Sequence, residues 1–298
     1  MKKLLVTGAS GQLGSRVLHH LLNTLGVPAD RIIATSRKPE ALSEWADQGV
    51  TVRAADFEDP ARLATAFAGA GRVLLISTDA LDRPGRRLEQ HSAAIAAAEK
   101  AGVGHLIYTS MPEPKGSPLL IAPDHAGTEA ALAGSSLPGW TVLRHHWYFE
   151  NLFMSLGQVL ASGQWYTAAG DGKIAHIARD DLGRSAAAAL ADDFDGKRTL
   201  TLSGAKAYTT VEIAALVSRT VGKPIRVIQV PVEGLVQGMV DAGLPEPLAR
   251  IFASFDTNTA AGRVAGVTRD FTALTGVDPQ PYEEWLAASK PALSGLAA

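Results

Sequence analysis

The segment that most constrains the fold is a glycine-rich stretch, residues 8–14, which reads GASGQLG. It directly follows the apolar run Lys3–Thr7, expected as a strand, and opens the pattern Gln12–Leu25, expected as a helix. Between a strand and a helix, three glycines at this spacing allow a tight turn, a close approach of the backbone to a pyrophosphate, and close packing of the helix on the strand. The helix N-terminus would then face the phosphates. This context predicts a dinucleotide site rather than a plain turn, formed by Gly8, Ser10, Gly11, Gln12, Leu13 and Gly14.

Short apolar runs alternate with longer helical patterns through the first two-thirds of the chain. This alternation is typical of repeated strand–helix–strand units and therefore of a parallel sheet. Most of the runs are apolar throughout, which indicates strands covered by helices on both faces. After Lys3–Thr7, the expected strands are Arg31–Ser36, Thr51–Ala54, Val73–Ser77, His105–Thr109 and Thr141–His145. The predicted fold class is α/β: a Rossmann-type doubly wound parallel sheet with a second, smaller α/β substrate lobe.

The length of 298 residues favours two lobes over one uniform core. We predict a dinucleotide-binding Rossmann domain over residues 1–150 and a smaller substrate lobe over residues 151–298, with the strand Thr199–Ser203 returning to the first sheet. Four local signals mark helix ends. Asp59-Pro60 predicts a helix start, and Gly102 predicts a helix end just before it. Asp180 or Asp181 is expected to cap a helix that runs through Ala191, and Thr209 to Glu212 is expected to form a capping box.

The composition excludes several classes of function. The chain has 28 Lys and Arg against 30 Asp and Glu, a formal net charge of -2, which gives no general attraction for nucleic acid or anionic lipid. It has no cysteine, so disulfides and cysteine-based metal sites are excluded, and a reducing cytoplasm suits it. No apolar run reaches the roughly 20 residues of a membrane-spanning helix. His145-His146 would point to opposite faces of a strand with no third ligand nearby, so no metal site is expected. A homodimer stays open.

The end of the second predicted strand indicates the choice of cofactor. An acidic residue there would bind the adenosine ribose hydroxyls and repel a 2′-phosphate. The sequence instead reads TSRK over residues 35–38, where Ser36 offers a hydroxyl and Arg37 a forked guanidinium to a phosphate. We therefore predict NADP(H) as the cofactor, with a solvated basic turn as the alternative for Arg37.

Polar and aromatic residues follow the other predicted strands, at the carboxyl ends where ligands bind in such sheets. Asp56 and Phe57 are suited to cover the adenine, although Asp56 is equally suited to cap a turn. Four hydroxyl side chains are expected near the ribose and nicotinamide, or as helix caps: Ser77, Thr78, Thr109 and Ser110. The proline-rich segment Met111–Pro123 is expected as an active-site loop.

Taken together, these segments resemble the NmrA-like, atypical branch of the short-chain dehydrogenase/reductases, over nearly the whole chain. Beside the glycine loop, the residues that carry the resemblance are Arg37, Asp56-Phe57, Tyr108-Thr109-Ser110 and Arg144-x-x-x-Tyr148-x-Glu150-Asn151. The quinone-reducing and triphenylmethane-dye-reducing members also share Gly170-Asp171-Gly172-Lys173 and Gln90-His91. The resemblance implies a flavin-free enzyme that passes hydride from NADPH to a quinone-like acceptor. One departure is His145-His146, where the relatives have Asn or Asn-Gly.

The predicted helix beyond the loop lacks the acid that ordinary carbonyl reduction needs. The better-known short-chain reductases carry Tyr-x-x-x-Lys there, whereas residues 124–129 read DHAGTE, and none of the five tyrosines has a lysine four residues on. A quinone needs less help, because hydride addition leaves a phenolate-like anion of low basicity. The candidate proton donors or orienting residues are Tyr148, His145 and His125, with packing as the alternative for Tyr148.

These observations favour an NAD(P)H:quinone oxidoreductase type of enzyme, with direct hydride transfer from NADPH to a quinone or similar flat acceptor. The acceptor would lie between the glycine loop and Trp147–Phe153, whose aromatic residues are equally suited to packing between lobes. Two alternatives stay open: an NADP(H)-binding redox sensor with little turnover, because the family includes regulatory members, and a reductase of triphenylmethane dyes.

Overall fold

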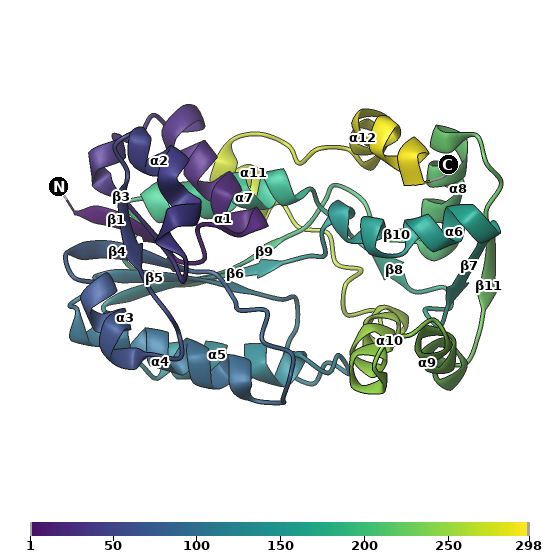
Figure 1. The fold of residues 1–298 in the computed structure, drawn as a ribbon, viewed down its shortest axis with the longest axis horizontal. Coiled ribbons are helices and arrows are strands. Elements are labelled where there is room, and N and C mark those ends of the chain that lie inside the picture. The colour runs from purple at the N-terminus through teal and green to yellow at the C-terminus, as the bar shows by residue number, and fades with distance from the viewer. Residues whose placement is uncertain (1, 297–298) are drawn as a thin grey trace.

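A computed structural model describes residues 2–296. Its first lobe is built on a seven-stranded parallel sheet with the order β3-β2-β1-β4-β5-β6-β9 (Figure 1). The strands are β1 Lys3–Val6, β2 Ile32–Ser36, β3 Thr51–Ala54, β4 Ala70–Leu75, β5 His105–Ser110, β6 Gly139–His145 and β9 Lys197–Leu202. A strand order that begins 3-2-1-4-5-6 is that of a doubly wound dinucleotide-binding sheet, so the predicted fold class is confirmed.

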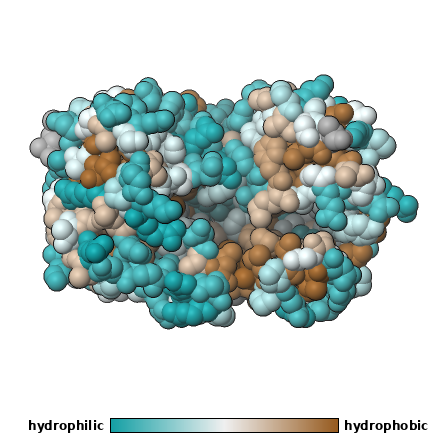
Figure 2. Space-filling view, in the orientation of Figure 1, coloured by the Kyte–Doolittle hydropathy of each residue, from teal (hydrophilic) through white to brown (hydrophobic). Residues whose placement is uncertain are grey.

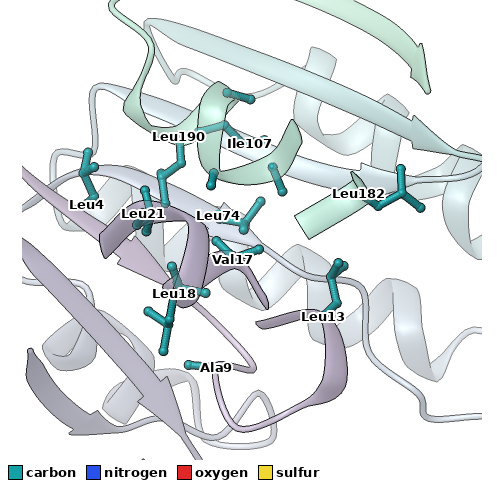
Figure 3. Close-up of a cluster of buried hydrophobic side chains, with 14 of the residues drawn as sticks. Leu4, Ala9, Leu13, Val17, Leu18, Leu21, Leu74, Ile107, Leu182 and Leu190 are labelled. Carbon is teal, nitrogen blue, oxygen red and sulfur yellow. The ribbon is translucent and has the colours of Figure 1, made fainter. Parts of the chain in front are cut away.

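Helices cover both faces of this sheet (Figure 1). One layer contains α1 Gln12–His19, α2 Ser43–Asp47, α7 Arg179–Ala191 and α11 Asp270–Thr275, and the other contains α3 Pro60–Ala66, α4 Arg86–Lys100 and α5 Ala122–Ala133. Every residue of β2 and β5 is buried, as expected for strands between two layers. Figure 3 shows part of the core on the α1 and α7 side, where Leu13 and Val17 lie in one apolar cluster with Leu182.

The second lobe contains two small sheets. Strands β8 Lys173–Ile174 and β10 Tyr208–Thr209 pair antiparallel, and β7 Gln164–Thr167 and β11 Arg226–Gln229 pair parallel. Its helices are α6 Leu156–Ser162, α8 Thr210–Val221, α9 Val232–Asp241, α10 Glu246–Ala260 and α12 Tyr282–Leu296. The chain crosses between the lobes repeatedly, because α7, β9 and α11 pack on the first sheet although they follow residue 150. The helices within residues 2–296 are all too short or too polar to cross a lipid bilayer.

Three local signals of the sequence are confirmed. The Asp59 side chain accepts a hydrogen bond from a backbone N–H of α3, and Pro60 opens that helix. Gly102 follows the last turn of α4 with a φ of 69°. Thr209 and Glu212 form the reciprocal capping box of α8. At these helix ends the sequence acts locally, so the tertiary contacts did not alter the outcome.

The predicted cap of α7 is wrong. The helix begins at Arg179, so Asp180 and Asp181 lie inside its first turn, and the Arg179 N–H is bonded instead to Glu150 Oε2 at 3.0 Å. Asp180 Oδ1 pairs with Arg16 Nη1 at 2.9 Å on α1, and Asp181 Oδ2 accepts a hydrogen bond from a distant backbone N–H. Long-range partners therefore took both carboxylates away from the capping role.

Strand β4 begins three residues before the predicted Val73 and ends two residues before the predicted Ser77. Its carboxyl end is set by side chains, because the Ile76 N–H is bonded to Thr7 Oγ1 at 3.0 Å and the Ser77 N–H to Thr109 Oγ1 at 2.9 Å. The first helix also differs: beyond His19 it widens into a π-helical turn, His20–Thr24, in which the buried His20 Nε2 lies 3.3 Å from Asp180 Oδ1.

Gly14 brings α1 directly against the turn that follows β1. A Cβ built on Gly14 would lie 2.3 Å from Gly8 O and 2.7 Å from Ala9 Cα. Both neighbours are backbone atoms and cannot swing away as a flexible side chain could. The direction of α1, and with it the position of its N-terminus above the sheet, therefore depends on a residue without a side chain at this point.

We predict that Gly14→Ala lowers the free energy of unfolding by about 3 kcal/mol, because relief of the clash must move α1 away from β1. Gly238→Ala is the matched control: it also lies inside a helix, but nothing stands within 4 Å of its added Cβ. That change is expected to stabilise by about 0.5–1 kcal/mol. Urea denaturation of both variants measures the difference, and equal stability of Gly14→Ala and the unmodified chain would contradict the packing argument.

Candidate cofactor and acceptor site

The glycine loop leaves an open helix N-terminus at the carboxyl edge of the sheet. Gly8 has a φ of 58°, and its carbonyl accepts a hydrogen bond from Gly11 N at 2.9 Å, which closes the turn. Gly11 is the N-cap of α1 and supplies no capping side chain, so the first N–H groups of the helix face outward. Gly8, Ser10, Gly11 and Gln12 are exposed, whereas the Leu13 side chain is buried in the core, so only the Leu13 backbone is available to a ligand.

The end of β2 lies against this loop. Ser10 Oγ and Ser36 Oγ are 2.9 Å apart, and Ala9 N donates to Thr35 O at 3.0 Å. Ser36 Oγ also accepts a hydrogen bond from Lys38 N at 3.0 Å. The Arg37 side chain is exposed and has no partner within residues 2–296. The structure therefore brings Ser36 and Arg37 to the rim of the glycine loop.

Asp56 and Phe57 both have roles within the protein. Asp56 Oδ1 accepts a hydrogen bond from Glu58 N at 3.0 Å, which is the turn-capping role considered from the sequence. Phe57 is partly buried against the core on the α3 and α4 side. Contact of either residue with adenine stays a prediction.

Side-chain hydrogen bonds hold the ends of β4 and β5. Thr109 Oγ1 accepts from Ser77 N, and Thr78 N donates to His91 Nε2 at 3.0 Å. Ser110 Oγ donates to Glu129 Oε1 at 2.7 Å. Glu129 also binds Arg144 through two hydrogen bonds, from Nε at 3.0 Å and from Nη2 at 2.7 Å. The hydroxyls of Thr109 and Ser110 thus stabilise the strand ends before any ligand binds.

A buried polar network lies behind these strand ends. His91 Nδ1 is 2.9 Å from Thr128 Oγ1, and His125 Nδ1 is 2.8 Å from the Tyr108 hydroxyl. Arg87 Nη2 donates to His125 Nε2 at 3.1 Å. Burial lowers the pKa of His91 to about 3, and burial together with Arg87 holds the pKa of His125 well below its usual value. Both imidazoles are neutral at pH 7, and both nitrogens of each ring are occupied.

His145 is the last residue of β6, and His146 follows it outside the strand, with its N–H bonded to Leu202 O at 3.0 Å. Both rings are buried. Within residues 2–296, neither nitrogen of His145 has a hydrogen-bond partner, nor has His146 Nδ1. Burial lowers the pKa of His145 to about 3 and that of His146 to about 4. His145 therefore carries one free donor and one free acceptor in its neutral form.

Tyr148 lies where the two lobes join. Its backbone forms a parallel bridge with Ile177, and Arg179 Cζ lies 5.1 Å from the centre of its ring. Burial raises the pKa of Tyr148 to about 12, although Arg179 acts in the opposite direction. Its hydroxyl makes no hydrogen bond within residues 2–296, which leaves it available to a ligand.

The aromatic residues around Tyr148 pack between elements of the second lobe. The Phe149 ring lies 4.4 Å from that of Tyr282, and Phe153 lies 5.7 Å from Trp285, measured between ring centres. Trp147 and Phe255 contact edge to face at 5.0 Å. Phe149 is fully buried in this role. An apolar wall for a flat acceptor stays a prediction for Trp147 and Phe153, which are only partly buried.

The predicted active-site loop, Met111–Pro123, connects β5 to α5 and is bonded to α10 of the other lobe. Ser117 Oγ donates to Asn258 Oδ1 at 2.6 Å, and Leu120 N donates to Ser254 Oγ at 3.1 Å. Arg263 Nη1, just beyond α10, pairs with Glu113 Oε2 at 3.0 Å. The loop thus ties the two lobes together beside the carboxyl edge of the sheet.

Figure 2 shows the molecular face hollowed between the two lobes, with apolar residues on the wall formed by the second lobe. A separate cavity of about 610 Å³ lies where α7 ends, between Ala188 and Leu274, and is also lined by Leu25 and Leu200. That cavity is at the amino ends of the strands, opposite the edge where ligands bind in doubly wound sheets. The glycine loop, the strand ends and Tyr148 lie at the carboxyl edge and form the candidate site.

Comparison with known proteins agrees with this geometry. The model of the NmrA-like family matches residues 1–286. The chain belongs to the NmrA-like family. Quinone oxidoreductase 2 of Escherichia coli K12 is 36% identical over 271 residues, which cover 91% of this chain and 93% of that protein. The family resemblance drawn from the sequence is confirmed.

Solved structures of NmrA-like proteins superpose over almost the whole chain. An NADPH-dependent quinone oxidoreductase from Escherichia coli, complexed with NADPH, matches with a TM-score of 0.89 at 35% identity and covers 97% of this chain and 99% of its own. The triphenylmethane reductase of Citrobacter sp., complexed with NADP(H), matches with a TM-score of 0.87 at 33% identity and covers 99% and 100%.

Sequence reasoning missed the partners that hold the site residues. Gln90-His91 is singled out from the sequence but Arg87 is not, although it lies four residues before His91 on the same face of α4. Glu129 on α5 had no such signal, because its pairing with Arg144 joins two elements that are distant in sequence. The network is therefore a property of the folded chain.

We predict that acid destabilises this protein steeply. Six buried histidines have lowered pKa values in the folded chain, so below about pH 6.5 the unfolded chain binds more protons and stability falls with pH. Each histidine contributes up to about 1.4 kcal/mol per pH unit between its unfolded pKa and its folded pKa. These residues are His91, His105, His125, His145, His146 and His176.

Urea denaturation between pH 7.5 and about 4.5 measures this dependence. Burial raises the pKa of Asp181 to about 6. Below that pH the folded chain therefore binds about one proton more than the unfolded chain at Asp181, which offsets the effect of one histidine. His105→Gln is the control variant, because a glutamine amide can still reach Thr141 while one titrating group is lost. In this variant the free energy of unfolding should change less steeply with pH, by the equivalent of about one proton. A free energy of unfolding that stays constant down to about pH 5 in the unmodified chain would contradict the prediction.

Proposed function

We propose that this protein is an NADPH-dependent reductase that passes hydride directly to a quinone-like conjugated acceptor without a flavin. Membership of the NmrA-like family and the similarity to quinone oxidoreductase 2 support this proposal. NADPH, when bound, supplies the hydride, and the chain supplies binding, orientation and electrostatics.

The residues present fit this cofactor. The uncapped N-terminus of α1 and the exposed backbone at Gly11 suit a pyrophosphate, since a side chain at Gly11 would stand 3.2 Å from Gly8 O in the mouth of the loop. Ser36 and Arg37 suit a 2′-phosphate at the rim. We assign the nicotinamide end to Ser77, Thr78, Thr109 and Ser110, where β4 and β5 end.

The single observation that carries the choice of acceptor is that His125 and Glu129, which stand on the α5 segment where the better-known short-chain reductases carry Tyr-x-x-x-Lys, are already bonded to other residues of the protein. His125 accepts from Arg87 and donates to Tyr108, and Glu129 is bound by Arg144 and Ser110. Neither can deliver a proton to an alkoxide at neutral pH. An acceptor whose reduced anion is only weakly basic, such as a quinone, does not need that proton.

The high pKa of Tyr148 supports an orienting role for its hydroxyl. With a pKa of about 12, Tyr148 is a weaker acid than a phenol of pKa about 10, so proton transfer to a phenolate-like product would be uphill by about 2 pKa units. The hydroxyl can still donate a hydrogen bond to a carbonyl oxygen. We propose the same orienting role for His145, whose nitrogens are unpaired and whose imidazole stays neutral.

The charges that act on Tyr148 favour a neutral quinone over a cationic dye. Arg179 and Arg87 are two cations, against the single carboxylate of Glu150. A quinone becomes anionic on accepting hydride and gains from this field, whereas a cationic acceptor would lose its charge there. We also propose a cytoplasmic site of action, which a chain without cysteine suits.

The test of this function is oxidation of NADPH by the purified protein with a small naphthoquinone, followed by the loss of NADPH absorbance beside a blank without enzyme. We expect saturable turnover, faster with NADPH than with NADH, from protein whose visible spectrum contains no flavin. Tight NADPH binding without turnover on quinones or dyes would instead support the redox-sensor alternative.

Arg37→Ala provides the matched variant for cofactor choice. Loss of a charge-assisted hydrogen bond should weaken NADPH binding by about 10-fold to 100-fold and leave NADH binding nearly unchanged. Arg219→Ala, an exposed arginine on α8, is the control and should change neither affinity. Equal losses for both cofactors would remove Arg37 from the 2′-phosphate site.

Tyr148→Phe tests the orienting hydroxyl. We expect turnover with a naphthoquinone to fall by about 10-fold, the equivalent of one hydrogen bond, while the affinity for NADPH stays the same. Tyr166→Phe, an exposed tyrosine on β7, serves as the control. Unchanged turnover in Tyr148→Phe would return Tyr148 to packing.

A further inference from the structure

We infer that His91 is a positioning residue that holds the Thr78 backbone at the carboxyl edge of the sheet. Thr78 N donates to His91 Nε2 at 3.0 Å, and Thr78 lies three residues beyond Leu75, where β4 ends. The inference rests on the proposed function, which assigns this strand end to the nicotinamide half of NADPH. His91 does not reach that site itself, because its ring is fully buried.

The hydrogen bonds around His91 run in one direction only. A backbone N–H can only donate, so the bond from Thr78 makes His91 Nε2 an acceptor and leaves the imidazole proton on Nδ1. The Nδ1–H then donates to Thr128 Oγ1 at 2.9 Å, and the Thr128 hydroxyl donates to Asp124 O at 2.7 Å. The chain from Thr78 through His91 and Thr128 to the Asp124 carbonyl therefore has a fixed direction, and the Tyr108 hydroxyl, 3.4 Å from the protonated His91 Nδ1, can only accept from it.

A second branch keeps the His91 ring in place. Arg87 Nη2 donates to His125 Nε2, which leaves the His125 proton on Nδ1, directed at the Tyr108 hydroxyl 2.8 Å away. The Tyr108 ring contacts His91 edge to face, with 5.3 Å between ring centres. Burial, together with Arg87 one turn earlier on α4, keeps His91 neutral, so the bond to Thr78 does not titrate near pH 7.

The hydroxyl of Thr78 is unpaired at the strand end. Thr78 Oγ1 is buried and has no hydrogen-bond partner within residues 2–296, whereas its backbone is held by His91 and the neighbouring Ser77 N–H by Thr109. An unpaired buried hydroxyl on a fixed backbone indicates a group that is completed by a ligand. His91 thereby sets the position of a ligand-binding hydroxyl from the far side of the strand end.

His91→Gln and His91→Asn separate positioning from packing. A glutamine amide reaches the place of Nε2 and can accept from Thr78, whereas an asparagine amide reaches only the place of Nδ1. Both variants lose the ring contact with Tyr108, and each loses one of the two hydrogen bonds of His91, glutamine the one to Thr128 and asparagine the one from Thr78, so their melting temperatures should be similar. We expect the Thr78 amide of His91→Asn, without cofactor, to exchange its hydrogen faster than that of His91→Gln. The affinity for NADPH should be about 10-fold weaker and kcat about 10-fold to 100-fold lower in His91→Asn than in His91→Gln.

Equal amide exchange, NADPH affinity and kcat in the two variants would overturn the inference and make His91 a packing residue. If neither variant folds, Thr128→Val and Thr128→Ser give the same comparison, because only serine retains the acceptor for His91 Nδ1. The exchange and binding measurements do not depend on turnover. If the protein reduces no quinone, the proposed function is wrong. The role of His91 is still decided by the exchange of the Thr78 amide and by the affinity for NADPH.

Discussion

The contact between Gly14 and the Gly8–Ala9 backbone is the constraint on which the site depends. It allows α1 to begin directly above the carboxyl end of β1, a central strand of the sheet. From there the first N–H groups of the helix face the open glycine loop, and Ser10 reaches Ser36 at the end of β2. A side chain at position 14 would separate the helix from the strand, and the N-terminus of α1 and the Ser10–Ser36 contact would no longer lie together at this edge of the sheet.

The same edge of the sheet is completed by side chains rather than by further strand pairing. Beyond β4, three successive backbone N–H groups are bonded to Thr7, Thr109 and His91. Parallel strands must stop pairing somewhere, and buried N–H groups left unpaired there would be costly. Because hydroxyl and imidazole acceptors take over at that point, the chain can leave the sheet in a fixed conformation and present Thr78 to a ligand.

Hydrogen bonds within the protein also limit how readily the site can donate a proton to a ligand. The buried imidazoles of His91 and His125 are neutral and fully bonded, Glu129 is held by Arg144, and burial makes Tyr148 a weak acid. Such a site can orient an oxygen atom and stabilise charge on it but has little capacity to deliver a proton at pH 7. This property suits an acceptor whose reduced form is stable as an anion, and it follows from the contacts of the folded chain rather than from a missing motif alone.

The sequence by itself determined the α/β class, the glycine loop, the helix signals at Asp59, Gly102 and Thr209, and the family, because each depends on neighbours within a few residues or on a pattern of burial along one element. The tertiary structure decided the rest. It placed α7 and α11 on the first lobe, paired Asp180 and Asp181 with distant groups instead of the helix end, and ended β4 at side chains from other strands. It also joined Arg87, His125 and Tyr108 from three elements. Hydrogen bonds and ion pairs of this kind depend on which elements meet in space, and that information is absent from any short stretch of sequence.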